Sequence, residues 1–111
     1  MLSPWAITAE KVQAAVKTIA EAYRPSRIII FGSYAAGNVH AHSDLDLLIV
    51  SREHVSNPRQ ESVKLRRLLR DIVMPMDILV VSESKLTIMA DTPGLIYREA
   101  LRTGKVVYES E

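Results

Sequence analysis

The sequence contains no cysteine, and this absence removes three kinds of chemistry at once. Disulfide bonds, thiolate zinc sites and cysteine nucleophiles are all excluded. A chain without cysteine also fits a reducing compartment, so we expect a cytoplasmic protein. The N-terminus has no basic segment followed by a continuous apolar stretch, and no apolar run is long enough to cross a membrane. Neither a signal peptide nor a membrane-spanning segment is therefore expected.

The sequence also lacks an excess of charge of either sign. Its 111 residues include 14 basic and 13 acidic side chains. A nearly neutral chain has no overall attraction to nucleic acids or anionic membranes, so direct nucleic-acid binding is not expected. Only local clusters of charge can indicate a charged partner. The length is typical of one domain with one hydrophobic core, and we expect a single domain over residues 1–111.

Apolar residues that recur at helical spacing predict helices along much of the chain. Three longer helices are predicted at about residues 9–23, 57–73 and 93–103, while residues 34–37 can hold a helical turn and the segment around Leu86 is ambiguous between a short helix and a loop. Start and stop signals support these assignments. Ser3 and Pro4 precede the first helix, Pro75 follows the second, and Gly104 stands where a left-handed cap would end the last one.

Short apolar runs rich in β-branched residues predict four strands. They span residues 27–31, 44–50, 76–81 and 105–109. The continuous apolarity of residues 27–31 indicates a strand that is covered on both faces. Alternating helices and strands predict an α/β (α+β) domain with a mixed sheet of about four strands. We expect helices to cover one side of this sheet and the functional site to lie at a sheet surface.

Three aspartates stand at the starts of two of these strands. Asp44 and Asp46 are two residues apart, so their side chains point to the same face. Asp77 is the only charge in Met76–Val81, and a neighbouring strand would bring it about 5 Å from the pair. Adjacent negative charges on an apolar strand need compensation, which a hard divalent cation provides. Without cysteine or a spaced histidine pair, such oxygen ligands favour magnesium or manganese, and two ions would support phosphoryl transfer.

Gly32 and Ser33 directly follow the first apolar strand. Glycine permits a sharp turn and the close approach of a ligand, and the serine hydroxyl can donate to a phosphate oxygen. The free N–H groups of a helical turn starting here would also favour a phosphate. No lysine occurs between Lys17 and Lys64, so the lysine-bearing P-loop is absent and metal would neutralise a triphosphate. The alternative interpretation is an ordinary turn, with the aspartates serving only as caps and strand ends.

Gly32-Ser33, ten intervening residues and Asp44-Leu45-Asp46 together resemble the signature of the polymerase-β-like nucleotidyltransferase superfamily. The length, the third aspartate in MPMDILVV and the ending REALRTGKVVYE resemble the minimal nucleotidyltransferases, often paired as antitoxins with HEPN-domain toxins. The resemblance covers nearly the whole chain. It implies that Gly32 and Ser33 bind nucleotide phosphates and that Asp44, Asp46 and Asp77 hold two Mg²⁺ ions. Asp77 would also help to deprotonate the acceptor.

The resemblance further implies transfer of a nucleoside monophosphate, with AMP from ATP as the expected case, to a hydroxyl. A HEPN-type toxin is the implied acceptor and partner, and pyrophosphate is the leaving group. One position departs from the family pattern, because Ala36 precedes Gly37 where many members carry an arginine. The alternative function is therefore an antitoxin or binding module that neutralises a HEPN ribonuclease by occlusion, with little or no catalysis.

Two further features are interpreted without a functional role. His40 and His42 lie beside Asp44, but no additional ligands accompany them, so a solvated loop is favoured over a zinc site. Basic side chains also occupy one arc of the predicted helix over residues 57–73. They are Arg59, Lys64, Arg66, Arg67 and Arg70. We interpret this arc as a solvated outer face, and the alternative is an interaction face for an acidic protein or RNA.

Overall fold

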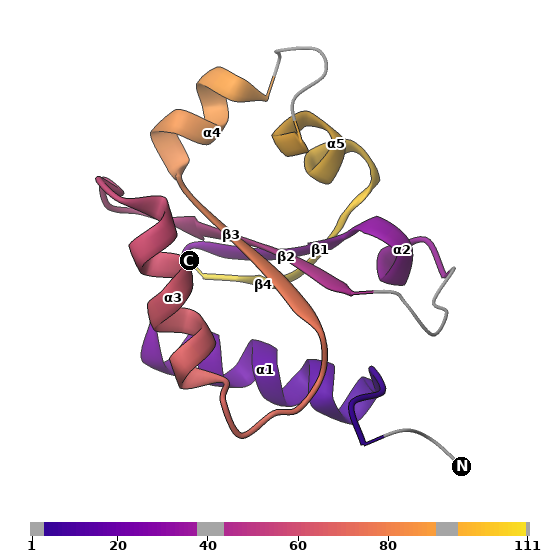
Figure 1. Cartoon of the computed structure of the whole chain (residues 1–111). Coiled ribbons are helices and arrows are strands. Elements are labelled where there is room, and N and C mark those ends of the chain that lie inside the picture. Colours follow the sequence, from indigo (N-terminus) through magenta and orange to yellow (C-terminus); the bar gives the residue numbers. More distant parts are fainter. Residues whose placement is uncertain (1–3, 38–43, 91–95, 111) are drawn as a thin grey trace.

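The computed structural model describes residues 4–37, 44–90 and 96–110, and Figure 1 shows their arrangement. The strands are β1 (Arg27–Phe31), β2 (Leu45–Ser51), β3 (Met76–Ser82) and β4 (Lys105–Glu109). The helices are α1 (Ala9–Ala22), α2 (Gly32–Ala35), α3 (Pro58–Leu68), α4 (Glu83–Met89) and α5 (Ile96–Thr103). The predicted loop with His40 and His42 lies outside the described residues, as do the first three residues of the helix predicted over residues 93–103.

The strands form one mixed sheet in the order β3-β2-β1-β4, which confirms the predicted fold class. Strand β1 pairs antiparallel with β2 and with β4. Strand β2 pairs in parallel with β3, and α3 supplies the crossover connection that a parallel pair requires. The parallel pair matters for the site, because both of its strands begin at the same end of the sheet.

Helices cover both faces of the sheet, so the prediction of one covered side is wrong (Figure 1). Ile28 and Ile30 of β1 belong to a core cluster with α1 and α3. Ile29 and Phe31 belong to a second cluster with α4 and α5. Successive side chains of a strand point to opposite faces, and a strand that is apolar on both faces needs a helix layer on each. The apolarity of residues 27–31 was therefore the correct signal.

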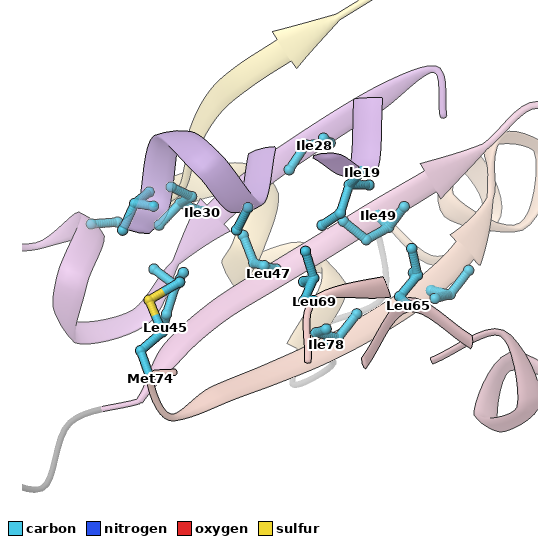
Figure 2. Close-up of a cluster of buried hydrophobic side chains, with 14 residues drawn as sticks. Ile19, Ile28, Ile30, Leu45, Leu47, Ile49, Leu65, Leu69, Met74 and Ile78 are labelled. Carbon is cyan, nitrogen blue, oxygen red and sulfur yellow. The ribbon is translucent and has the colours of Figure 1, made fainter. Parts of the chain in front are cut away.

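Figure 2 shows the core cluster between the sheet and the helices α1 and α3. Its residues from β2 occupy every second position, namely Leu45, Leu47 and Ile49, each fully buried. Burial of each such side chain stabilises the fold by roughly 1.5–3 kcal/mol relative to exposure. The intervening positions of β2 point to the opposite face. This alternation fixes the face on which Asp46 lies.

The ends of two helices differ from the prediction. Helix α1 is capped by Thr8, whose Oγ1 accepts a hydrogen bond from the Lys11 amide at 3.2 Å, and not by Ser3 and Pro4. Helix α3 starts as predicted, since Asn57 Oδ1 accepts from the Gln60 amide at 3.1 Å. It ends at Leu68 and not near Val73, because the chain leaves the helix in a way that buries Leu69 and Met74.

The prediction of a left-handed cap at Gly104 is also wrong, because this glycine does not have a positive φ. It is needed for close packing. A Cβ at this position would overlap the carbonyl oxygen of Ala100 and lie 2.8 Å from Ile29 Cγ2. Gly104 therefore lets the end of α5 approach β1. Every helix in the described part of the chain is too short or too polar to span a bilayer.

Candidate active site

The pairing of three strands brings the predicted site residues to one end of the sheet. In the parallel pair, Asp46 of β2 stands directly opposite Asp77 of β3. In the antiparallel pair, Asp46 stands opposite Phe31, the residue before Gly32. Asp44 precedes β2 by one residue. Because neighbouring strands are about 4.8 Å apart, the glycine turn and the aspartates lie side by side.

Asp46 points away from the core cluster of α1 and α3. Its neighbours Leu45 and Leu47 are fully buried in that cluster, so the alternation of the strand directs Asp46 to the face of α4 and α5. Asp46 is half-buried there, whereas Asp44 and Asp77 are exposed. The three side chains thus lie at the end of the sheet where β2 and β3 begin, and Asp46 is the most buried of them.

Gly32 is required at the turn for two reasons. Its φ of +75° lies in the left-handed region that other residues rarely adopt. A Cβ at this position would also overlap Asp46 Oδ2. The turn leads directly into α2, whose N-terminal end has no side-chain cap, and Ser33 is its second residue. The Asp46 carboxylate therefore lies against the glycine turn, and the two predicted halves of the site are in contact.

The Asp46 carboxyl group is in an unfavourable electrostatic environment. Burial raises its pKa, and the nearby carboxylates of Asp77 and then Asp44 raise it further. The Asp46 side chain forms no hydrogen bond or ion pair with any residue that the structure describes. A half-buried acid without a compensating partner leaves room for a cation or a proton at this point.

The donor set fits a hard divalent cation, since carboxylate oxygens are the ligands that Mg²⁺ prefers. Within residues 4–37, 44–90 and 96–110, no three acidic, histidine or cysteine side chains are already grouped with metal-binding geometry. Metal binding by Asp44, Asp46 and Asp77 therefore stays a prediction.

Arg66 of α3 lies close to this site, a position that the sequence analysis missed. Its Nη2 is 3.7 Å from Oδ1 of Asp77, and both side chains are about half exposed, at 51% and 54%. Because β3 is an edge strand, a side chain from α3 reaches Asp77 around the edge of the sheet. The available signal was that α3 leads into β3, which places residues near the end of this helix beside the start of that strand.

The fold and the site define the class of this protein as a nucleotidyltransferase-type domain. Residues 14–111 match the family described as polymerase beta, nucleotidyltransferase. The chain belongs to this family, which confirms the resemblance seen in the sequence at that level. A search of curated proteins found no match.

Two solved structures have a similar fold. One is a crystal structure of a candidate nucleotidyltransferase from Sulfolobus solfataricus, with 20% identity and a TM-score of 0.63, covering 90% of this chain and 78% of that chain. The other is a mutant form of the MntA-HpeT toxin-antitoxin complex, with 18% identity and a TM-score of 0.62, covering 96% of this chain and 76% of that chain. At these identities, the likeness shows a shared fold.

Proposed function

We propose that this chain is a magnesium-dependent nucleotidyltransferase that transfers AMP from ATP, or the monophosphate of another nucleoside triphosphate, to a hydroxyl group. Family membership supports the transferase class. The observation that carries the proposal is the position of Asp46, which faces Asp77 on the next strand while its carboxylate lies against the Gly32 turn. The proposed metal ligands and the proposed phosphate-binding turn are therefore parts of one site.

In this proposal, Gly32 and Ser33 bind the phosphates through backbone amides and the serine hydroxyl. Asp44, Asp46 and Asp77 would hold the magnesium ions, which neutralise the phosphates and stabilise the charge that develops during transfer. Asp77, on the edge strand, is open to an incoming acceptor and would accept its hydroxyl proton. Leu45 and Leu47, which are fully buried on the opposite face of β2, keep Asp46 fixed in the sheet.

The proposed acceptor is a hydroxyl on a partner protein of the HEPN toxin class, with this chain acting as the antitoxin in the cytoplasm. The similar fold of a chain from the MntA-HpeT toxin-antitoxin complex supports this role.

The proposal is tested by incubating the protein with ATP labelled at the α-phosphate, Mg²⁺ and a purified HEPN partner. We expect the label to appear on the partner with the wild type and to be lost in Asp44→Ala and Asp46→Ala. Glu21→Ala, an exposed acid on α1, is the matched control and should transfer normally. Neutralisation of the toxin by the wild type without any label transfer would sink the enzyme proposal.

A second candidate function is neutralisation by occlusion with little catalysis. Ala36 favours it, because this exposed residue caps the C-terminal end of α2 where an arginine would supply a phosphate contact. If that contact limits the rate, Ala36→Arg should raise label transfer by about tenfold, the effect of one charge-assisted hydrogen bond. Ala36→Gln adds length without charge and serves as the control. Occlusion is supported instead if Asp46→Ala neutralises the toxin as well as the wild type does.

A further inference from the structure

A groove of about 480 Å³ lies where the chain turns from α3 into β3. Its lining is mainly apolar and comes from Trp5, Leu69 and residues 72–76, while Arg66 and Arg70 add positive charge. Trp5 and Val73 are 58% and 55% exposed. Large apolar side chains that are exposed together mark interaction surfaces more often than solitary ones do. We refer to this feature as the edge groove.

The edge groove and the candidate active site lie at the same end of the sheet but on opposite faces, because Leu69, Met74 and Met76 pack with the cluster of α1 and α3, whereas Asp46 points away from it. The carbonyl oxygen of Pro75 accepts a hydrogen bond of 2.9 Å from the amide of Leu45, the residue between Asp44 and Asp46. Met76 lines the groove and is followed directly by Asp77. Figure 2 shows Met74, another lining residue, beside Leu45 at this end of β2. A molecule in the groove would therefore reach Asp77 around the β3 edge, where Arg66 lines the groove and its Nη2 lies 3.7 Å from Asp77 Oδ1.

Lys11 holds the two walls of the edge groove together. Its Nζ donates hydrogen bonds to the carbonyl oxygens of Pro4 and Ala6, which flank Trp5, at 2.7 and 2.8 Å. The same Nζ donates to the carbonyl oxygen of Val73 on the opposite wall at 2.7 Å. The backbone on both sides of the exposed Trp5 is thus held in place. A surface that is ordered before binding loses less conformational entropy when a partner docks.

The order of the strands indicates what the groove receives. Gly32 follows β1 on one side of Asp46, and Asp77 lies on β3 at the other side. In an in-line displacement, the attacking oxygen approaches opposite the leaving pyrophosphate. If the donor phosphates occupy the Gly32 turn, the acceptor approaches from the β3 edge, where the groove lies.

We propose that the edge groove docks the acceptor as a protein segment with an apolar anchor flanked by acidic side chains. This proposal rests on the nucleotidyltransferase function proposed above. The docked hydroxyl oxygen forms a bond to the α-phosphorus while the bond from that phosphorus to the pyrophosphate oxygen breaks. The hydroxyl proton passes to Asp77. The anchor fills the apolar floor near Trp5 and Val73, and Arg70 pairs with an acidic flank.

The lining favours an acidic protein segment over RNA. Two arginines among mostly apolar side chains complement a few negative charges around an apolar anchor. A sugar–phosphate backbone would gain little from Ile72, Val73 and Met74, which carry no hydrogen-bonding side chains. The net charge of +1 also gives no long-range attraction to a polyanion.

The test uses the emission of Trp5, which is the only tryptophan in the chain and reports directly on the groove. The probe is a synthetic peptide with one tyrosine between two leucines, flanked by glutamates. We expect a saturable change in Trp5 emission, and weaker binding by about tenfold in Arg70→Glu, because charge reversal replaces attraction by repulsion. Arg67→Glu is the matched control, since Arg67 is an exposed arginine at the end of α3, three residues before Arg70, and does not line the groove.

Further variants and peptides distinguish a failure of the docking proposal from a failure of the transferase function on which it rests. Val73→Asp should abolish peptide binding, and the peptide with lysines in place of glutamates should not bind. Asp46→Ala should stop label transfer to the tyrosine but retain the change in Trp5 emission. If the peptide binds and no label is transferred by the wild type, the transferase proposal fails and the docking site stands. If label is transferred equally by the wild type and Arg70→Glu, or if only a single-stranded RNA changes Trp5 emission, the edge groove proposal is overturned.

Discussion

Asp46 shows at the scale of one residue how this site differs from the rest of the sheet. Its neighbours in β2 are fully buried apolar residues, while its own carboxylate lies half-buried beside Asp77 and Asp44. No described residue donates a hydrogen bond to it. Such an arrangement opposes stability, and residues that reduce stability are typical of functional sites. Asp46 is therefore the best position for testing function against folding.

Asp46→Asn should stabilise the protein at neutral pH. The raised pKa of Asp46 means that the folded state binds a proton more readily than the unfolded state, whose Asp pKa is about 3.9. Stability therefore falls as pH rises through the range between the unfolded and the folded pKa. We expect the substitution to raise the free energy of unfolding at pH 7 by less than about 1 kcal/mol, because solvent screens this site. The gain should vanish near pH 3.

Urea unfolding at both pH values measures this effect, and Glu21→Gln on the exposed face of α1 is the control. A loss of stability in Asp46→Asn at pH 7 would contradict the prediction, because it would mean that the carboxylate is stabilised by its surroundings.

At the scale of elements, the strands were predicted more accurately than the helix ends. Four apolar runs gave the four strands, since alternation and β-branching report directly on burial in a sheet. Local signals misplaced the end of α3 and the cap of α1, because the competing cap Thr8 and the tertiary packing of Leu69 and Met74 decide those ends.

The site was predictable in part for the same reason. The spacing of Gly32 and Asp46 encodes a turn and a strand, and the structure brings them into contact. The parallel register that sets Asp77 opposite Asp46 depends on pairing between distant segments. The positions of Arg66 and of Trp5 depend on how α3 and the N-terminal segment pack, which no local pattern specifies.

Lys11 is predicted to determine the order of the N-terminal segment. Lys11→Met keeps most of the apolar stem but removes three hydrogen bonds to carbonyl oxygens that tie Pro4 and Ala6 to Val73. We expect a loss of about 1–2 kcal/mol in the free energy of unfolding, since these contacts are partly exposed. The Trp5 side chain should also become more accessible, so that a soluble quencher reduces its fluorescence more strongly than in the wild type.

Lys17→Met, on an exposed position of the same helix, is the matched control and should leave both measurements unchanged. Unchanged quenching of Trp5 in Lys11→Met would show that apolar contacts alone hold the N-terminal segment.

At the scale of the whole molecule, the same sheet provides stability and the site. Apolar side chains on both faces of β1 and β2 hold the centre of the sheet between two helix layers. The acid side chains and the glycine turn occupy only the end where β2 and β3 begin and β1 finishes. Ligand binding at this end should therefore stabilise the folded state without rearranging the core.

Mg²⁺ and ATP together are predicted to raise the melting temperature of the wild type. At a ligand concentration about 100 times the dissociation constant, binding to the folded state alone adds roughly 2.7 kcal/mol, which corresponds to a shift on the order of 10 °C for a domain of this size. Thermal unfolding with and without EDTA measures the shift. Asp46→Asn, compared with its own ligand-free baseline, should lose most of it, because the ions would lack a central ligand. An equal shift in Asp46→Asn, or a shift that persists with EDTA, would place nucleotide binding away from the aspartates and against the proposed site.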